Sequence, residues 1–173
     1  MRGAPSFPRA PLVIGLGNER RGDDAVGLLV ATAVRERLGQ GARVFECSGD
    51  LTKLLDMWAD EPTVFVVDAV VSGSAPGTVH VVDLLALGEG SATPVTSTHG
   101  VSLSGAVALG RALGRLPGEL FLYGVEASQL SIGSGVGRHT PVAIAEVTER
   151  LVTALRAAEG GRTAVGSRKA GDA

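Results

Sequence analysis

Two aspartates and one histidine in this 173-residue chain have the side chains that a divalent metal site needs: Asp24, Asp68 and His99. Two carboxylates and one imidazole supply oxygen and nitrogen ligands, which suit a divalent metal of intermediate hardness and leave coordination positions open. The three residues are far apart in the sequence, so they form one site only where the fold brings them together.

Short apolar runs alternate with amphipathic stretches along the chain, and they predict the strands and helices that position these residues. The apolar runs predict strands over 11–17, 42–47, 63–71, 78–84 and 118–127. Helical spacing predicts helices over 24–38, 52–59, 101–113 and 141–157. This order predicts an α/β fold, a three-layer αβα sandwich with a mostly parallel twisted sheet of about five strands. Ligands of such sheets bind outside the carboxyl ends of the strands, where all three candidate ligands are expected.

One domain accounts for most of the chain. We expect residues 11–158 to form a single α/β domain, with a disordered N-terminal extension over 1–10. A disordered tail is expected over 159–173, which is rich in Gly, Ala and charge without periodicity. No run suits a signal peptide or a membrane span, so we expect a cytoplasmic protein.

Composition narrows the class of function. Hydrophobic residues make up 45% of the chain, which is ample for a core. The formal net charge of −2 argues against nucleic acid as a partner. The single cysteine, Cys47, excludes a disulfide framework within the chain and a multi-cysteine zinc site.

Each candidate ligand also has a purely structural interpretation. Asp24 suits the first turn of the helix over 24–38, and Asp23 is predicted to be the N-cap of that helix. Alternatively, Asp68 forms an ion pair with an arginine at the sheet edge. Alternatively, His99 caps the following helix or forms a hydrogen bond with a carbonyl group.

The segment Gly15-Leu16-Gly17 begins like a dinucleotide-binding fingerprint, and Glu46 follows near the end of the second strand, where a ribose-binding acid belongs. Arg20 occupies the position of the third glycine. The pair Asp23-Asp24 places two carboxylates where a pyrophosphate needs bare amides. A nucleotide-binding domain that uses Gly15 and Gly17 therefore remains only an alternative.

Other polar residues receive simpler predictions. Cys47 follows an apolar strand and is expected to be a buried thiol. His80, in an exposed-looking strand, and His139, before Thr140-Pro141, are expected to be surface or capping residues. Thr140 is the predicted N-cap of the last helix. Asp50 and Glu126 follow strands and are candidates for supporting or substrate-contacting roles.

Several of these residues together resemble the hydrogenase maturation endopeptidase family, over about residues 12–157. The motifs that carry the resemblance are Gly15-Leu16-Gly17-Asn18, the later Asp23-Asp24 and Gly27, Asp68-Ala69, Thr98-His99-Gly100 and Tyr123-Gly124-Val125-Glu126. One departure is Ser48-Gly49-Asp50, where some relatives have a Gly-Thr segment.

The resemblance implies a metal-dependent endopeptidase that removes the C-terminal extension of a nickel–iron hydrogenase large-subunit precursor after nickel insertion. The metal contacts of the family carry over onto Asp24, Asp68 and His99. It implies nickel supplied by the precursor, with zinc or cadmium able to occupy the site in vitro. We expect a monomer without membrane or nucleic-acid partners. The alternative within the same pathway is a non-catalytic nickel chaperone for that precursor.

Overall fold

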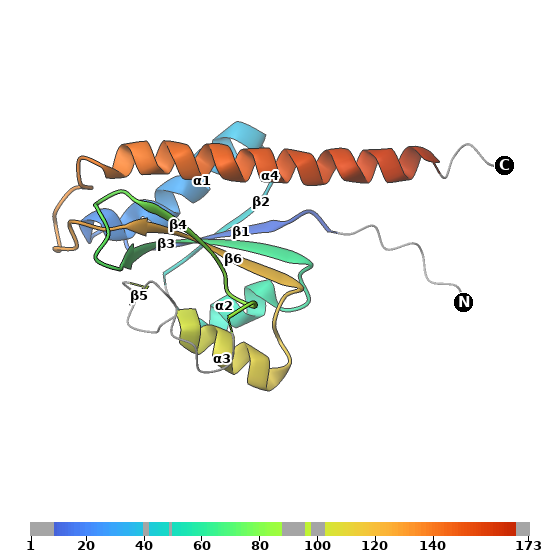
Figure 1. The fold of residues 1–173 in the computed structure, drawn as a ribbon, viewed down its shortest axis with the longest axis horizontal. Helices are drawn as coiled ribbons and strands as arrows, with labels where there is room; N and C mark the ends of the chain where they lie inside the picture. The colour runs from blue at the N-terminus through green and yellow to red at the C-terminus, as the bar shows by residue number, and fades with distance from the viewer. Residues whose placement is uncertain (1–8, 40–41, 49, 88–95, 98–102, 169–173) are drawn as a thin grey trace.

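Three layers make up the protein in the computed structural model, which describes residues 9–39, 42–48, 50–87, 96–97 and 103–168. Helices α1 (Val26–Leu38) and α4 (Thr140–Arg168) cover one face of a central sheet (Figure 1). Helices α2 (Leu51–Trp58) and α3 (Leu103–Leu113) cover the other face. The predicted αβα sandwich is confirmed.

The sheet is parallel except at one edge. Its strands are β1 (Leu12–Leu16), β2 (Arg43–Cys47), β3 (Thr63–Val71), β4 (Val79–Asp83) and β6 (Glu119–Glu126). They lie in the order β2-β1-β3-β6-β4, and β4 runs antiparallel to β6. A two-residue strand, β5 (Thr96–Ser97), pairs antiparallel with the end of β3. Within the order β2-β1-β3-β6-β4, only β4 runs antiparallel to its neighbour. The turn at Pro76-Gly77 reverses the chain before β4 begins.

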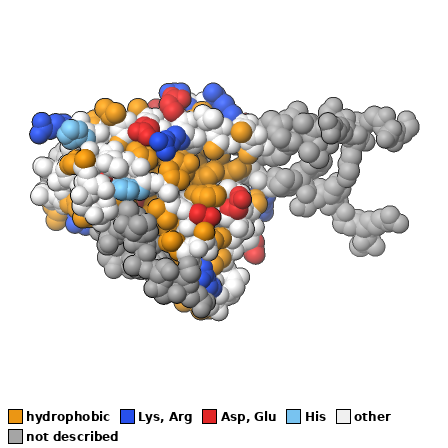
Figure 2. Space-filling view, in the orientation of Figure 1, with side chains coloured by type: hydrophobic (Ala, Val, Ile, Leu, Met, Phe, Trp, Pro, Cys, Tyr) orange, Lys and Arg blue, Asp and Glu red, His pale blue; other side chains and the backbone are white. Residues whose placement is uncertain are grey.

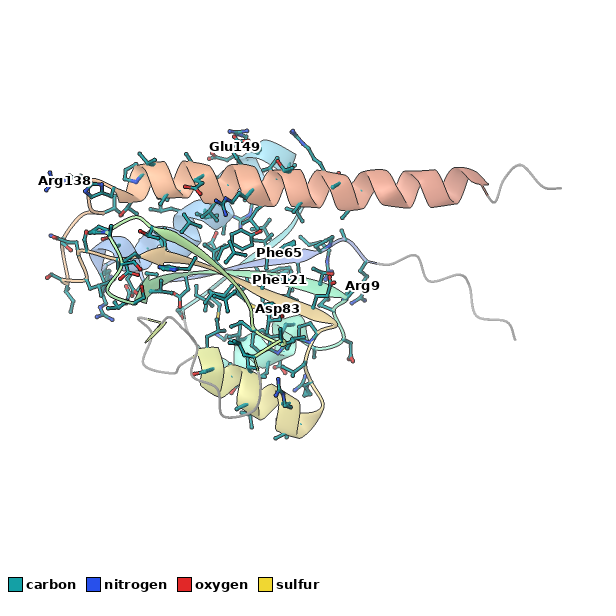
Figure 3. The ribbon with its side chains drawn as sticks, in the orientation of Figure 1. Arg9, Phe65, Asp83, Phe121, Arg138 and Glu149 are labelled. Carbon is teal, nitrogen blue, oxygen red and sulfur yellow. The ribbon has the colours of Figure 1, made fainter. Side chains whose placement is uncertain are left out.

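Alternate side chains of each central strand enter two separate cores. In β1, Ile14 belongs to the core under α2 and α3, whereas Val13 belongs to the core under α1 and α4. Phe65 of β3 stacks on Phe121 of β6 beneath α4, with ring centroids 5.9 Å apart (Figure 3). Burial on both faces explains why these strands are continuous apolar runs in the sequence.

The open edge at β4 leaves apolar side chains on the surface. Val81 is 48% exposed, and Figure 2 shows hydrophobic side chains over this part of the molecule, below α4. Among the described residues, no helix is both long enough and apolar enough to cross a bilayer.

The last helix is longer than the sequence predicts. The expected helix over 141–157 and the expected disordered tail from 159 are wrong in one respect, because α4 continues to Arg168. Gly160 and Gly161 lie inside this helix, where each glycine costs about 1 kcal/mol relative to alanine but does not forbid helical backbone. Residues 1–8 and 169–173, which were expected to be disordered, lie outside the described residues.

Candidate metal centre

Asp68 lies at the carboxyl edge of the sheet. Gly15 of β1 pairs with Val67 of β3, and β1 ends one residue later, so Asp68 is the first residue of β3 beyond that pairing. Its side chain is 0% exposed. By strand alternation it points toward the α2 and α3 side of the sheet, as Val66 does.

Asp24 reaches the same edge from a different element. It lies in the 3₁₀ turn η1 (Gly22–Ala25), which precedes α1 and packs against β3. Its side chain is also 0% exposed, and the guanidinium of Arg21 lies 3.8 Å from its Oδ2. The structure therefore brings two wholly buried carboxylates from η1 and β3 to one edge.

Glycine makes this close approach possible. A methyl group built at Gly27, in the first turn of α1, would overlap the carbonyl oxygens of Leu16 and Val67. A methyl group at Gly15 would overlap the carbonyl of Gly27 in the same way. Only glycine at both positions lets α1 start directly against the ends of β1 and β3, which is where Asp24 and Asp68 lie.

His99, the third predicted ligand, lies outside the described residues. Within the described part of the chain, no group of three His, Cys, Asp or Glu side chains is arranged to hold a metal ion. The assignment of Asp24, Asp68 and His99 as metal ligands therefore remains a prediction.

Asp23 does not cap the helix that follows it, contrary to the prediction. The helix α1 begins after Ala25, which has no side-chain cap, because the chain first makes the turn η1. The carboxylate of Asp23, 2% exposed, instead accepts hydrogen bonds from the loop between β6 and α4. Its donors are Ser128 N at 2.8 Å, Ser128 Oγ at 3.1 Å, Gln129 N at 2.9 Å, Gly137 N at 2.6 Å and the hydroxyl of Thr140.

These hydrogen bonds determine the charge state of Asp23. Burial alone would raise the pKa of the carboxyl group, because it disfavours the ionised form. The bonds from Thr140, Gly137, Ser128 and Gln129 outweigh burial, so the pKa is lower than its ordinary value. Thr140 is the first residue of α4, and its hydroxyl serves Asp23, so the N-cap role predicted for it gives way to a long-range contact.

Glu126 holds a second loop in the same manner. Its buried carboxylate accepts bonds from Ser72 N at 2.9 Å, Ser72 Oγ at 2.7 Å and Gly73 N at 3.0 Å, directly after β3. His80 Nε2 lies 3.2 Å from the same carboxylate, and His80 is 21% exposed, so this residue is partly buried against Glu126. Burial raises the pKa of Glu126, but the bonds from Ser72, Gly73 and His80 outweigh it and lower the pKa overall.

This cluster is not a catalytic triad. Ser72 Oγ and Glu126 Oε2 both contact the same nitrogen, Nε2 of His80, at 3.4 Å and 3.2 Å. A triad needs the acid and the nucleophile on opposite ring nitrogens. The contacts of Glu126 therefore have a structural role, which is to fasten the loop after β3.

The other predicted residues have local roles. Asp50 caps α2 by accepting bonds from Thr52 N and Lys53 N. Cys47 is a buried thiol, as predicted, and its Sγ lies 3.7 Å from the carbonyl oxygen of Asp50. His139 is exposed, as predicted.

The glycine loop after β1 uses its own amides. Gly17 N donates to the carbonyl of Cys47 and Asn18 N to the carbonyl of Asp24, both at 3.1 Å. A methyl group at Gly17 would lie 2.5 Å from the Asp24 carbonyl, so this glycine serves packing against η1. A phosphate needs free amides at this turn, so the geometry disfavours the nucleotide-binding alternative. The carboxylate of Glu46, the expected ribose ligand, pairs with Arg35 at 3.0 Å.

These features define a three-layer α/β protein with two buried carboxylates at the carboxyl edge of its sheet. No family model matches the sequence, and no curated protein matches it. The fold does match solved structures. The hydrogenase maturating endopeptidase HybD from E. coli is 26% identical, with a TM-score of 0.66 over 84% of this chain and 91% of that one.

Two further matches show the same fold. The [NiFe] hydrogenase maturation protease HycI from Thermococcus kodakarensis is 23% identical, with a TM-score of 0.65 over 87% of this chain and 95% of that one. An endopeptidase from E. coli, known from a solution structure, is 23% identical, with a TM-score of 0.67 over 84% and 92% of the two chains. The chain therefore has the fold of solved hydrogenase maturation endopeptidases.

Proposed function

We propose that this protein cuts the large-subunit precursor of a nickel–iron hydrogenase once and removes its C-terminal extension after nickel has been inserted. The likeness to E. coli HybD over 84% of the chain carries the proposal. The two wholly buried carboxylates at the carboxyl edge of the sheet add to it, because this edge is the usual ligand site of parallel α/β folds.

The proposed nickel contacts are Asp24, Asp68 and His99. Ser97 of β5 lies opposite Val70 of β3 in an antiparallel pairing. Asp68 precedes Val70 by two residues in β3. His99 lies outside the described residues, and its place in the ligand set rests on the Thr98-His99-Gly100 motif of the sequence.

The donor set fits a divalent transition metal. Carboxylates and imidazole are ligands for nickel, zinc and related ions. Asp24 and Asp68 are both wholly buried at this edge. The guanidinium of Arg21, 3.8 Å from Oδ2 of Asp24, shows that a cation already lies close to this carboxylate.

Nickel enters this scheme as part of the substrate. The only thiol of the chain, that of Cys47, is buried at the end of β2 and directed at the Asp50 carbonyl, so soft thiolate ligands must come from the precursor. Recognition of the loaded metal would then make cutting wait for correct nickel insertion. A bound nickel ion can also polarise a carbonyl or lower the pKa of a water molecule.

The test is cleavage of purified precursor, with and without nickel, by the wild-type protein and by Asp24→Asn, Asp68→Asn and His99→Ala. We expect the wild type to cut only loaded precursor and the three variants to remain folded but inactive. Asp56→Asn is the control, because Asp56 is exposed and pairs with Arg115 on the outer surface. Equal cleavage with and without nickel would contradict metal recognition, and normal cleavage by the variants would contradict the ligand assignment. Nickel binding without any cut would favour the chaperone alternative.

A further inference from the structure

A cavity of about 350 Å³ opens beside the candidate metal centre. Its apolar lining comes from η1, α1 and the loop that leads into α4: Ala25, Leu28, Leu29 and Val136. Two carboxylates, those of Glu19 and Glu46, also line it. In Figure 1 the start of α1 and the loop before α4 lie together at the end of the molecule opposite the two termini.

The cavity is continuous with the elements that carry Asp24. Gly22 and Ala25, the first and last residues of η1, both line it, and Asp24 lies between them. A peptide that presents its scissile region to Asp24 would therefore extend into this cavity within a few residues. The opposite wall, which includes Val136, belongs to the loop that Asp23 holds through Gly137 N.

The two carboxylates that line the cavity differ in their partners. Glu46 pairs with Arg35 at 3.0 Å, so its charge is already matched. Glu19 is exposed, and none of the described residues forms a hydrogen bond or ion pair with its side chain. Among the described residues, the cavity thus offers one unmatched negative charge together with an apolar lining, in which Leu29 is 41% exposed and Val136 is 39% exposed.

We propose that this cavity is a subsite that holds a segment of the precursor in which an apolar side chain lies next to a lysine or arginine. The apolar side chain packs on Leu28, Leu29 and Val136, and the cationic side chain pairs with Glu19. The proposal rests on the proposed function, since it needs a peptide substrate at the edge that carries Asp24. It makes the cavity a determinant of which precursor is accepted.

The experiment compares Leu29→Glu and Glu19→Gln with matched controls in two assays on the nickel-loaded precursor, cleavage and equilibrium binding. Leu109→Glu is the control for Leu29, because Leu109 is 40% exposed but lies on α3, on the other face of the sheet. Glu36→Gln controls for loss of one exposed carboxylate on α1. Binding is compared among proteins that all carry Asp68→Asn, so that the precursor is not consumed and the loss of this proposed nickel contact is the same in each of them.

We expect Leu29→Glu to weaken binding and raise KM by about tenfold with kcat little changed, because apolar anchors in a pocket dominate such contacts. Glu19→Gln should raise KM by about threefold and reduce its dependence on salt. Wild-type binding and KM in both variants would overturn the subsite. A wild type that binds precursor through Leu29 and Glu19 but never cuts it would keep the subsite and overturn the protease proposal; absence of both binding and cutting would overturn both.

Discussion

The backbone amide of Gly137 lies 2.6 Å from Oδ1 of Asp23, although the two residues are 114 positions apart in the sequence. This contact, with the bonds from Ser128 and Gln129, fastens the loop between β6 and α4 to the turn that carries Asp24. The loop in turn supplies one wall of the cavity beside that turn. A single buried carboxylate therefore links the candidate metal centre to the proposed peptide subsite.

The first prediction concerns Asp23. Asp23→Asn replaces one acceptor oxygen with an NH₂ group that faces the donors of the loop, so buried amides lose their partner. We expect the free energy of unfolding to fall by about 1.5–3 kcal/mol, the range for hydrogen bonds to charged groups. Urea unfolding at pH 7 measures it, with Asp56→Asn as the exposed control. Equal stability of both variants would show that the loop does not depend on this carboxylate.

The second prediction concerns pH and Glu126. Its pKa lies below the ordinary value of 4.5, so the unfolded chain binds a proton more readily than the folded protein does. The stabilisation is complete above the ordinary value and is lost as the pH falls through the lower, folded-state pKa. Glu126→Gln should be less stable than the wild type at pH 7 and should lose less stability between pH 5 and pH 3.

Thermal unfolding across that pH range measures this difference, with Glu36→Gln as the control for loss of an exposed carboxylate. His80 is the titratable group in contact with Glu126, and His80→Gln in the same series separates its contribution. Parallel stability curves for the wild type and Glu126→Gln would contradict the prediction.

The sequence predicts the strands better than the loops. A strand is visible in a local run of apolar residues, whereas the contacts of a loop come from residues far away in the sequence. The apolar run over 63–71 matches β3 at both ends, since burial on both faces needs an uninterrupted apolar strand. The position of Asp24 and Asp68 at one sheet edge follows from strand order alone. The acceptor role of Asp23 does not, since a local pattern shows a capping residue and its real donors lie more than 100 residues away.

His80 illustrates the same limit. Alternation in the strand that contains it suggests an exposed side chain, but the partner that covers it, Glu126, comes from β6 and is fixed by the antiparallel pairing of β4 with β6. The cavity beside η1 also escapes prediction, because it combines α1, the end of β2 and the loop before α4. Glu19, an acid directly after the glycine-containing segment Gly15-Leu16-Gly17-Asn18, is the signal in the sequence that points toward it.

The third prediction concerns the contact between α1 and the sheet. Gly27→Ala adds a methyl group that overlaps the carbonyl oxygens of Leu16 and Val67, so α1 must move away from β1 and β3. We expect a loss of about 1–3 kcal/mol in unfolding free energy, which is typical of overpacking. We also expect the folded variant to cleave the precursor more slowly than the wild type. Gly135→Ala is the stability control, because a methyl group there meets no other atom within 4 Å. Full activity of Gly27→Ala would show that the position of α1 does not set the site.

The fourth prediction concerns Arg21, whose guanidinium lies 3.8 Å from Oδ2 of Asp24. Its positive charge competes with a metal ion for this carboxylate, and the arginine is 37% exposed, so solvent screens part of the effect. Arg21→Ala should bind added nickel chloride about threefold more tightly than the wild type, as measured by titration calorimetry. Arg20→Ala is the control, because Arg20 is exposed and no salt bridge between its side chain and a described carboxylate is seen. Equal or weaker nickel binding by Arg21→Ala would mean that Arg21 supports the metal site rather than competing with the ion, and Asp24→Asn should reduce binding in either background.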